Sequence, residues 1–380
     1  MNLHLFNPEN DLALARDLAN YTAPPAAVAL ARAGAVLPLW YGEPGDSFVC
    51  DGLNAGWLRR MTDTFGLRTR LWDHSGAGIT PAPWGWSKAV RSRFKNLGFG
   101  PETLPSDEIL DRLRLLSSRR SACFLGADLA RAGLMRPAFV PREISSLPQA
   151  KEYCREYPDA LFKLPWSSSG RGQIRVNSEA AFDARATAIE GALRRYGFLT
   201  AEPFHRDKAL DLALLFTART SGAVTPAGIS LFRTFPNGDY AGNILASDED
   251  LLRSIDSPFG IAGTLGAISH RLCESLGTLL GGDYSGPLGV DMMVLRSGET
   301  VPCVELNLRM TMGHVARHFH DRFCAQDSTG LFSISSLKPD APGEPEISGG
   351  RLVRGDLRLN PPGPAIAFTA SVDTGKIVLI

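Results

Sequence analysis

Apolar and polar residues alternate along the first third of the chain in two periods, one typical of strands and one of helices. Residues 3–6 form a short apolar run, and the polar loop at residues 7–11 leads into an Ala/Leu-rich helical segment. Proline before and glycine after such segments mark helix ends. We expect further helices at residues 26–33, 54–65, 88–97 and 106–116, and strands at residues 35–41 and 69–72. This alternation predicts a parallel sheet covered by helices.

Hairpins and longer helices dominate the rest of the chain. The turn signals Pro236-Asn237-Gly238 and Ser297-Gly298 predict two hairpins, formed by residues 230–234 with 239–243 and by residues 288–295 with 300–306. Other strands are expected at 137–140, 160–165, 198–202, 210–217, 352–359 and 365–372, and helices at 127–134, 147–157, 179–196, 248–254 and 261–280. The Pro/Gly/Glu-rich stretch at residues 338–350 is typical of a linker.

Length and composition limit the classes of protein. A chain of 380 residues predicts two or three packed units. Its 40 basic and 40 acidic residues leave no basic excess for a nucleic-acid partner. Its apolar runs are too short to span a bilayer, and the first residues lack the layout of a signal peptide. Six cysteines without paired spacing fit a reducing cytoplasm. We therefore expect a cytoplasmic protein without a membrane or nucleic-acid partner.

The densest chemistry lies in the segment Val304-Glu305-Leu306-Asn307-Leu308-Arg309. On a strand, Glu305, Asn307 and Arg309 share one face, and the apolar residues between them point into a core. Carboxylate and amide oxygens suit Mg²⁺, and a guanidinium suits a phosphate. The segment therefore predicts a magnesium–nucleotide site.

Two further features extend this site. Asp291 interrupts an apolar strand; it is either an exposed edge-strand acid or, across the predicted hairpin, a partner of Glu305 and Asn307. Lys163 precedes the Ser/Gly-rich stretch at residues 167–172, which is either a surface loop or an anion-binding loop whose small residues expose backbone N–H groups.

Weaker signals concern the substrate. Three polar residues, Glu9, Asn10 and Asp11, either cap the following helix or bind an amine. Residues 232–234 and 240–243, which include Arg233 and Asn243, either line an acceptor site or only decorate a hairpin. His314 and His318 have helical spacing that could bind a metal, but a solvated face or a substrate contact by His314 is favoured.

Along the chain come, in order, Lys163 with its Ser/Gly loop, Glu202 with Asp211, Asp291 and the Glu-x-Asn-x-Arg ending. This order of motifs resembles that of the ATP-grasp superfamily over residues 117–321. The ending is similar to those of biotin carboxylase and carbamoyl-phosphate synthetase. The resemblance implies an α/β chain with α+β elements. It would comprise a Rossmann-like pre-ATP-grasp domain (1–116), a two-lobed ATP-grasp fold (lid and phosphate loop 117–200; adenine hinge and metal site 201–335) and a linker with a C-terminal β segment (336–380).

The resemblance also implies roles for individual residues. Lys163 would contact the α- and β-phosphates of ATP, and Asp211 the ribose. Arg309 would stabilise the phosphate during transfer. The remaining implied contacts are a loop closing over the β- and γ-phosphates (Ser168, Ser169, Gly170, Arg171, Gly172), an adenine hinge (Glu202, Pro203, Phe204), a second basic residue (Arg119 or Arg120) and ligands of one or two Mg²⁺ ions (Asp291, Glu305, Asn307).

The resemblance therefore implies an ATP- and Mg²⁺-dependent ligase that joins a carboxylate to an amine through an acyl phosphate. A small-molecule kinase and a non-catalytic nucleotide-binding protein are the alternatives. Small-molecule substrates, such as amino acids or peptides, and a homodimer are expected. Candidate substrate contacts are Glu9, Asn10, Asp11, Arg233, Asn243 and His314.

Overall fold

The N-terminal unit of the chain contains a parallel four-stranded sheet. The computed structural model describes residues 1–74, 78–167, 172–235, 239–336 and 344–373. The strand order of this sheet is β3-β2-β1-β4, and every pairing is parallel, as predicted. The strands are β1 (Asn2–Leu5), β2 (Ser47–Phe48), β3 (Arg70–Leu71) and β4 (Thr80–Pro83). The helices of this unit are α1 (Asn10–Arg16), α2 (Pro25–Gly34), α3 (Pro38–Tyr41), α4 (Ala55–Phe65), α5 (Lys88–Asn96), η1 (Pro101–Thr103) and α6 (Asp107–Leu116).

The predicted strand at residues 35–41 is wrong, because this apolar run is helical. Pro38 stands in the first turn of α3, where its fixed φ and missing N–H are tolerated. Trp40 is fully buried, and its indole Nε1 donates to the carbonyl of Leu359 at 2.8 Å. A run that is buried on every side has no polar period by which helix and strand can be distinguished. The predicted strand at residues 137–140 is also wrong, since η2 (Pro137–Phe139) is a 3-10 turn.

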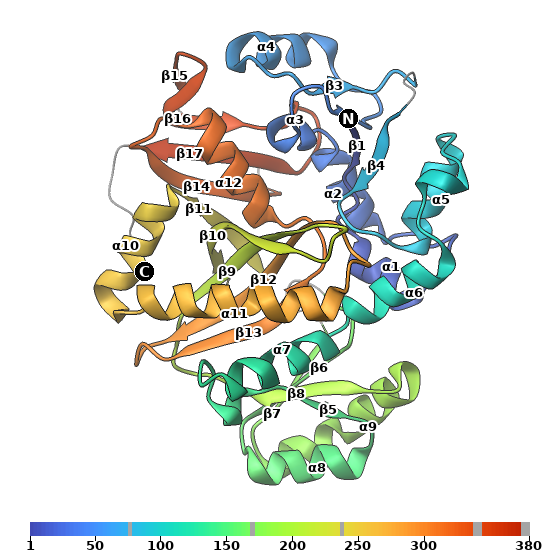
Figure 1. Ribbon diagram of the computed structural model, residues 1–380, viewed down its shortest axis with the longest axis vertical. Helices are drawn as coiled ribbons and strands as arrows, with labels where there is room; N and C mark the ends of the chain where they lie inside the picture. The colour runs from blue at the N-terminus through green and yellow to red at the C-terminus, as the bar shows by residue number, and fades with distance from the viewer. Residues whose placement is uncertain (75–77, 168–171, 236–238, 337–343, 374–380) are drawn as a thin grey trace.

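A small antiparallel lobe follows, shown in green at the bottom of Figure 1. Its sheet has the order β5-β8-β6-β7, and helices α8 and α9 enclose one core with it. The elements are β5 (Arg142–Ile144), α8 (Leu147–Glu156), β6 (Ala160–Lys163), β7 (Gln173–Val176), α9 (Glu179–Tyr196) and β8 (Leu199–Pro203). Before it, α7 (Arg120–Arg131) packs against α11 and β13 of the central sheet.

The central sheet has nine strands in the order β13-β12-β9-β10-β11-β14-β17-β16-β15. Both predicted hairpins are present, as β10 with β11 and as β12 with β13; residues 236–238, the turn of the first, lie outside the described residues. The elements are β9 (Lys208–Ala218), β10 (Val224–Thr234), β11 (Tyr240–Leu245), α10 (Asp248–Phe259), α11 (Ala262–Leu280), β12 (Gly286–Leu295), β13 (Thr300–Asn307), α12 (Met312–Phe323) and β14 (Thr329–Ser335).

The last strands of the chain belong to this same sheet. They are β15 (Glu346–Ser348), β16 (Arg351–Arg358) and β17 (Ala367–Asp373), and β17 pairs with β14 along its whole length. The described end of the predicted linker therefore contains strand β15, which pairs with β16. Phe368 on β17 packs edge-on against Phe6, which follows β1, with ring centroids 6.2 Å apart. The N-terminal unit and the C-terminal strands thus share one core.

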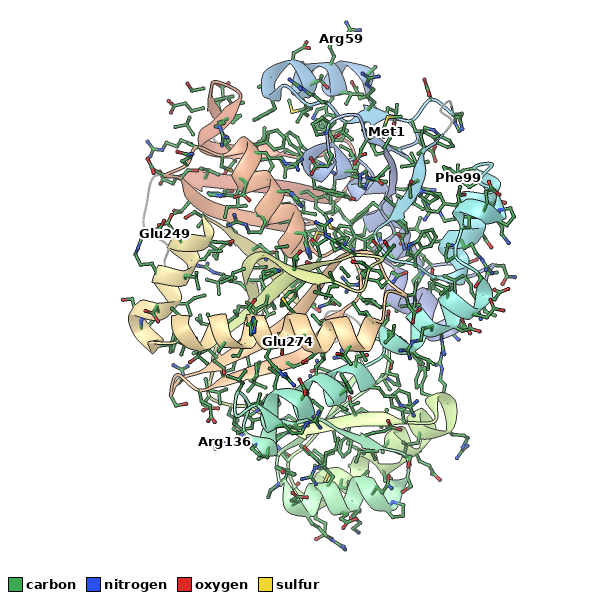
Figure 2. All side chains as sticks on the ribbon, viewed as in Figure 1. Met1, Arg59, Phe99, Arg136, Glu249 and Glu274 are labelled. Carbon is green, nitrogen blue, oxygen red and sulfur yellow. The ribbon has the colours of Figure 1, made fainter. Side chains whose placement is uncertain are left out.

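Charged side chains such as Arg59, Arg136 and Glu249 lie at the periphery in Figure 2, while the spaces between layers are filled. No helix in the described ranges is long and apolar enough to cross a membrane.

We predict that Gly330→Ala destabilises the protein by about 2 kcal/mol, since overpacking costs about that much. A Cβ at Gly330 on β14 would lie 2.0 Å from the backbone oxygen of Ser371 on β17. Urea unfolding measures the change. The control is Gly266→Ala on α11, where a Cβ would meet nothing within 4 Å. This substitution should leave the free energy of unfolding unchanged or raise it. Equal midpoints for both variants would contradict the pairing of β14 with β17.

Candidate functional site

The site is built on the β12–β13 hairpin, whose register sets its polar side chains together. Asp291 on β12 lies directly opposite Glu305 on β13, and Gly289 lies opposite Asn307. Because side chains two residues apart share a face, Glu305 and Asn307 project from β13 on the side of Asp291. All three line one cavity of about 390 Å³. Leu306, between them on the other face, is buried in the main core, as the alternation predicts.

Asp291 has the most perturbed carboxyl of the site. Burial raises the pKa of Asp291 to about 7, and the neighbouring Glu305 carboxylate acts in the same direction. The Asn307 amide donates to the Asp291 carboxylate and, with the Arg309 charge, opposes this rise in its pKa. Two carboxylates that resist being ionised together are stabilised in their charged form when a cation binds to both.

A buried arginine from outside the hairpin contacts Glu305. Arg119, at the start of α7, lies 3.1 Å from Glu305 (Nη1 to Oε2), and its side chain is only 6% exposed. It also donates to the carbonyls of Leu164 (3.1 Å) and Ser167 (3.4 Å). Arg119 therefore connects Glu305 to the segment that follows β6.

Arg309 follows β13 and pairs with Asp11 of the N-terminal unit. Its Nη2 lies 2.9 Å from Asp11 Oδ2, and its Nε lies 3.3 Å from Asp11 Oδ1. The backbone N–H of Met310 donates to the carbonyl of Trp84 at 2.9 Å, which fixes the chain just after Arg309. The N-terminal loops thus hold Arg309 at the rim of the cavity.

Arg120 is placed differently from its neighbour Arg119. Its guanidinium makes two hydrogen bonds with Glu143, at 2.7 and 2.6 Å, and lies over the ring of Phe198. Its side chain is 46% exposed. Of the two arginines, only Arg119 therefore contacts the carboxylates of the hairpin in the described structure.

Lys163 ends β6 and is buried against Glu202, with which it forms an ion pair. These residues lie on adjacent antiparallel strands, because Lys163 pairs with Thr200, two residues before Glu202. Ser168, Ser169, Gly170 and Arg171 lie outside the described residues. Gly172, which is described, has a φ of 69° and returns the chain to Leu164 through a 2.9 Å backbone hydrogen bond.

The other residues expected to contact nucleotide lie between the lobe and the central sheet. Pro203 ends β8, and the ring of Phe204 lies under the guanidinium of Arg175, with Arg175 Cζ 3.6 Å from the ring centroid. Asp211 on β9 accepts hydrogen bonds from Lys208 (2.5 Å) and Thr234 (3.0 Å).

The cavity has an apolar wall from the N-terminal unit and a polar wall from the central sheet. Leu12, Ala27 and Leu30 lie on the first, and Ser230 and Asn243 on the second, beside Thr311 at the start of α12. A narrow crevice on the other side of Glu305, Asn307 and Arg309 is lined by residues 165–167. These three side chains therefore lie between the large cavity and the loop after β6.

The three polar residues of the N-terminal loop have separate surroundings. Glu9 lines the cavity, and its Oε2 is buried without a hydrogen-bond partner. The amide of Asn10 is buried and, in the orientation that satisfies its surroundings, donates to the carbonyls of Gly85 (3.0 Å) and Trp86 (3.3 Å). Asp11 pairs with Arg309. Side-chain capping of α1 by Glu9 is not observed.

Both candidate segments, residues 232–234 and 240–243, contribute side chains to the cavity. Phe232, Thr234, Tyr240 and Asn243 line it, and Asn243 donates to Ser230 Oγ at 2.6 Å. Arg233 is exposed and does not line it, because successive side chains on a strand point to opposite faces.

His314 is buried in α12, where its Nδ1 lies 2.9 Å from Thr311 Oγ1. Burial, together with the nearby His318, lowers the pKa of His314 to about 3. His314 does not itself line the cavity, although Thr311 does. Within the described ranges, no group of three or more His, Cys, Asp and Glu could hold a metal. A cation at Asp291 and Glu305 would therefore depend on the Asn307 amide and on oxygens from outside the protein.

Sequence reasoning did not identify Ser230 and Thr311, or the pairing of Arg309 with Asp11. Ser230 and Thr311 carry no local motif; only the folded sheet brings them to the cavity. A buried-looking arginine implies a carboxylate partner, but no spacing rule identifies one 298 residues away.

No protein-family model and no curated protein sequence matches this chain. Among solved structures, biotin carboxylase from Campylobacter jejuni, in a β,γ-ATP complex, is 12% identical over 98% of this chain and 87% of that chain, with a TM-score of 0.51. N5-carboxyaminoimidazole ribonucleotide synthetase from Thermus thermophilus is 16% identical over 99% and 94%, with a TM-score of 0.48. The Staphylococcus aureus N5-carboxyaminoimidazole synthetase, complexed with ADP, is 12% identical over 77% and 83%, with a TM-score of 0.44.

The likeness to biotin carboxylase is one of fold. It spans nearly the whole chain, and its TM-score is the one above 0.5 among these three. The chain therefore has an α/β fold like that of this biotin carboxylase, which confirms the fold class predicted from the sequence.

We predict that Asp291→Asn stabilises the metal-free protein at pH 8 by about 1–2 kcal/mol more than at pH 5. Because the pKa of Asp291 is raised in the folded state, its contribution to the free energy of unfolding is fully present below about pH 4. That contribution is lost as the pH rises through about 7. Asparagine carries no charge and avoids this loss. Urea unfolding in EDTA measures the difference. The exposed Asp183→Asn on α9 is the control, and an equal effect of both variants at pH 8 would contradict the raised pKa.

Proposed function

We propose that this protein is an ATP- and Mg²⁺-dependent ligase that joins a carboxylate to an amine. The observation that carries the proposal is the convergence of Asp291, Glu305, Asn307 and Arg309 on one cavity. Three of these residues, Glu305, Asn307 and Arg309, border the loop after β6 on their other side. A phosphoryl group delivered from the side of that loop would therefore meet an acceptor held in the cavity.

On the nucleotide side, Lys163 would bind the α- and β-phosphates, since it is a buried cation at the start of the Ser/Gly-rich loop. The loop itself, Ser168 to Gly172, would cover the β- and γ-phosphates. Glu202, Pro203 and Phe204 would form the adenine hinge, and Asp211 would bind the ribose. These assignments extend the superfamily resemblance to matching positions of this chain.

The hairpin would hold the metal. Asp291, Glu305 and Asn307 supply hard oxygen atoms on one face, with Asp291 directly opposite Glu305 in the hairpin. Mg²⁺ would neutralise charge on the transferring phosphoryl group. Asn307 would orient the Asp291 carboxylate through its amide, and Arg119 would orient Glu305.

The reaction would proceed in two steps. A substrate carboxylate oxygen attacks the γ-phosphorus of ATP, which yields an acyl phosphate and ADP. The amine nitrogen then attacks the acyl carbon, the bond to the phosphate oxygen breaks, and the nitrogen loses a proton. Arg309 would stabilise the phosphate oxygens in both steps, because it lies at the cavity rim with its guanidinium oriented by Asp11.

A kinase that stops at the phosphorylated product is the second candidate. The large polar-and-apolar cavity favours the ligase, because it offers room for a second substrate beside the hairpin. Amine dependence separates the two candidates. ADP release that requires an amine supports the ligase, and a stable phosphorylated product without amine would support the kinase.

We predict that Glu305→Gln lowers Mg²⁺-dependent turnover by about 100-fold, since one preorganised electrostatic contact contributes about that much. ADP release would first be screened with Mg-ATP against amino acids and short peptides, singly and in pairs. Glu190→Gln, an exposed carboxylate on α9, is the control and should keep wild-type turnover. Undiminished turnover in Glu305→Gln would count against a catalytic metal at the hairpin.

We predict that Arg119→Lys weakens Mg-ADP binding about tenfold, whereas Arg120→Ala changes it less than about twofold. Arg119 contacts Glu305 with one guanidinium nitrogen and Leu164 and Ser167 with the other two, which a lysine cannot reproduce. Arg120 makes an exposed pair with Glu143. Calorimetric titration measures both. The reverse order of effects would assign the second basic residue to Arg120.

A further inference from the structure

Glu9 stands at one end of an apolar wall in the cavity. The wall consists of Leu12 on α1, Ala26, Ala27 and Leu30 on α2, and Trp84 after β4. Glu9 is therefore a carboxylate set beside hydrocarbon within an enclosed space, and its side chain is only 15% exposed. Burial raises the pKa of Glu9.

The protein satisfies only one of the two Glu9 oxygens. Oε1 lies 3.4 Å from Nη1 of Arg93, a long contact to a side chain that is 47% exposed. Oε2 is buried and has no hydrogen-bond partner among the described residues. A buried carboxylate oxygen without a donor is costly, and Glu9 does not use it to cap α1.

The two neighbours of Glu9 in sequence are committed within the protein. The buried Asn10 amide, in the orientation that satisfies its surroundings, donates to the carbonyls of Gly85 and Trp86. Asp11 forms a two-contact ion pair with Arg309. Glu9 is thus the one of these three residues that lines the large cavity.

The charges around the cavity favour a cationic guest. Its lining contains the carboxylates of Glu9, Asp291 and Glu305 and the guanidinium of Arg309, which is already paired with Asp11. If a metal takes the two carboxylates of the hairpin, Glu9 remains beside the apolar wall as an anion whose ion-pair partner is the half-exposed Arg93.

We propose that Glu9 and this wall form a subsite for a primary alkylammonium group. The ammonium would donate to the Glu9 carboxylate, whose side chain lines the cavity, and its hydrocarbon chain would lie against Leu12, Ala27 and Leu30. The placement of this subsite in a reaction rests on the ligase proposed above. In that reaction, the inference identifies the amine substrate, or the carboxylate substrate's own amino group, as one attached to an apolar chain.

The test compares three six-carbon probes of similar shape: hexylamine, hexan-1-ol and hexanoate. Each is titrated into the full-length protein at pH 7.5 without ATP and followed by ligand-observed NMR. The wild type should bind hexylamine about tenfold more tightly than hexan-1-ol, with hexanoate weakest, because a charge-assisted hydrogen bond contributes about that factor.

Three variants isolate the carboxylate. Glu9→Gln should bind hexylamine and hexan-1-ol equally, and Glu9→Asp should keep part of the preference for the amine. Glu190→Gln, on the exposed face of α9 in the other lobe, should behave as wild type. Melting temperatures check that each variant is folded, and a purely structural role for Glu9 would lower these without changing the amine-to-alcohol ratio.

The outcomes separate this inference from the proposed function. A wild type that binds none of the probes, or that prefers the alcohol or the acid, overturns the subsite, as does a Glu9→Gln variant that keeps the preference. Amine-dependent ADP release that is unchanged in Glu9→Gln would leave the ligase standing without the subsite. Probe binding that depends on Glu9, with no ADP release from any substrate pair, would leave the subsite standing without the ligase.

Discussion

Two carboxylates at directly opposed positions of one hairpin impose the main electrostatic constraint on this structure. Asp291 and Glu305 share a cavity wall, and their mutual repulsion adds to the cost of burial. Two guanidinium groups from outside the hairpin strands, those of Arg119 and Arg309, offset this repulsion. Each guanidinium is itself anchored by further contacts, so the repulsion is balanced by groups whose positions depend on separate parts of the chain.

The anchors of these arginines make the hairpin the meeting point of three units. Arg119 bonds to the carbonyls that follow β6, so the small lobe is tied to Glu305. Arg309 is held by Asp11, so the N-terminal unit is tied to the end of β13. A change in charge at the hairpin therefore acts on contacts of both neighbours. This arrangement gives a physical route by which events on the two sides of the site can influence one another.

The sequence predicted the site's local geometry well and its partners poorly. A two-residue period and a Ser-Gly turn are enough to place Asp291 across from Glu305, because both signals are local. The apolar run at residues 35–41 was misread as a strand, since full burial removes the polar period. The pairings of Arg309 with Asp11 and of β17 with β14 join residues far apart in sequence, and no local pattern encodes such pairings.

The contact of Trp40 with the carbonyl of Leu359 has a consequence for how the chain is synthesised. It joins residues 319 positions apart, inside a core that Phe6 and Phe368 also share. A nascent chain therefore exposes the aromatic face of its first unit until its last strands leave the ribosome. The loop that carries Glu9 and Asp11 follows β1 in that unit. In a partly synthesised chain, the small lobe would already be present while the cavity wall opposite the hairpin was still incomplete. Closure of this core therefore waits for β16 and β17, which supply Leu352, Leu357 and Phe368 to it.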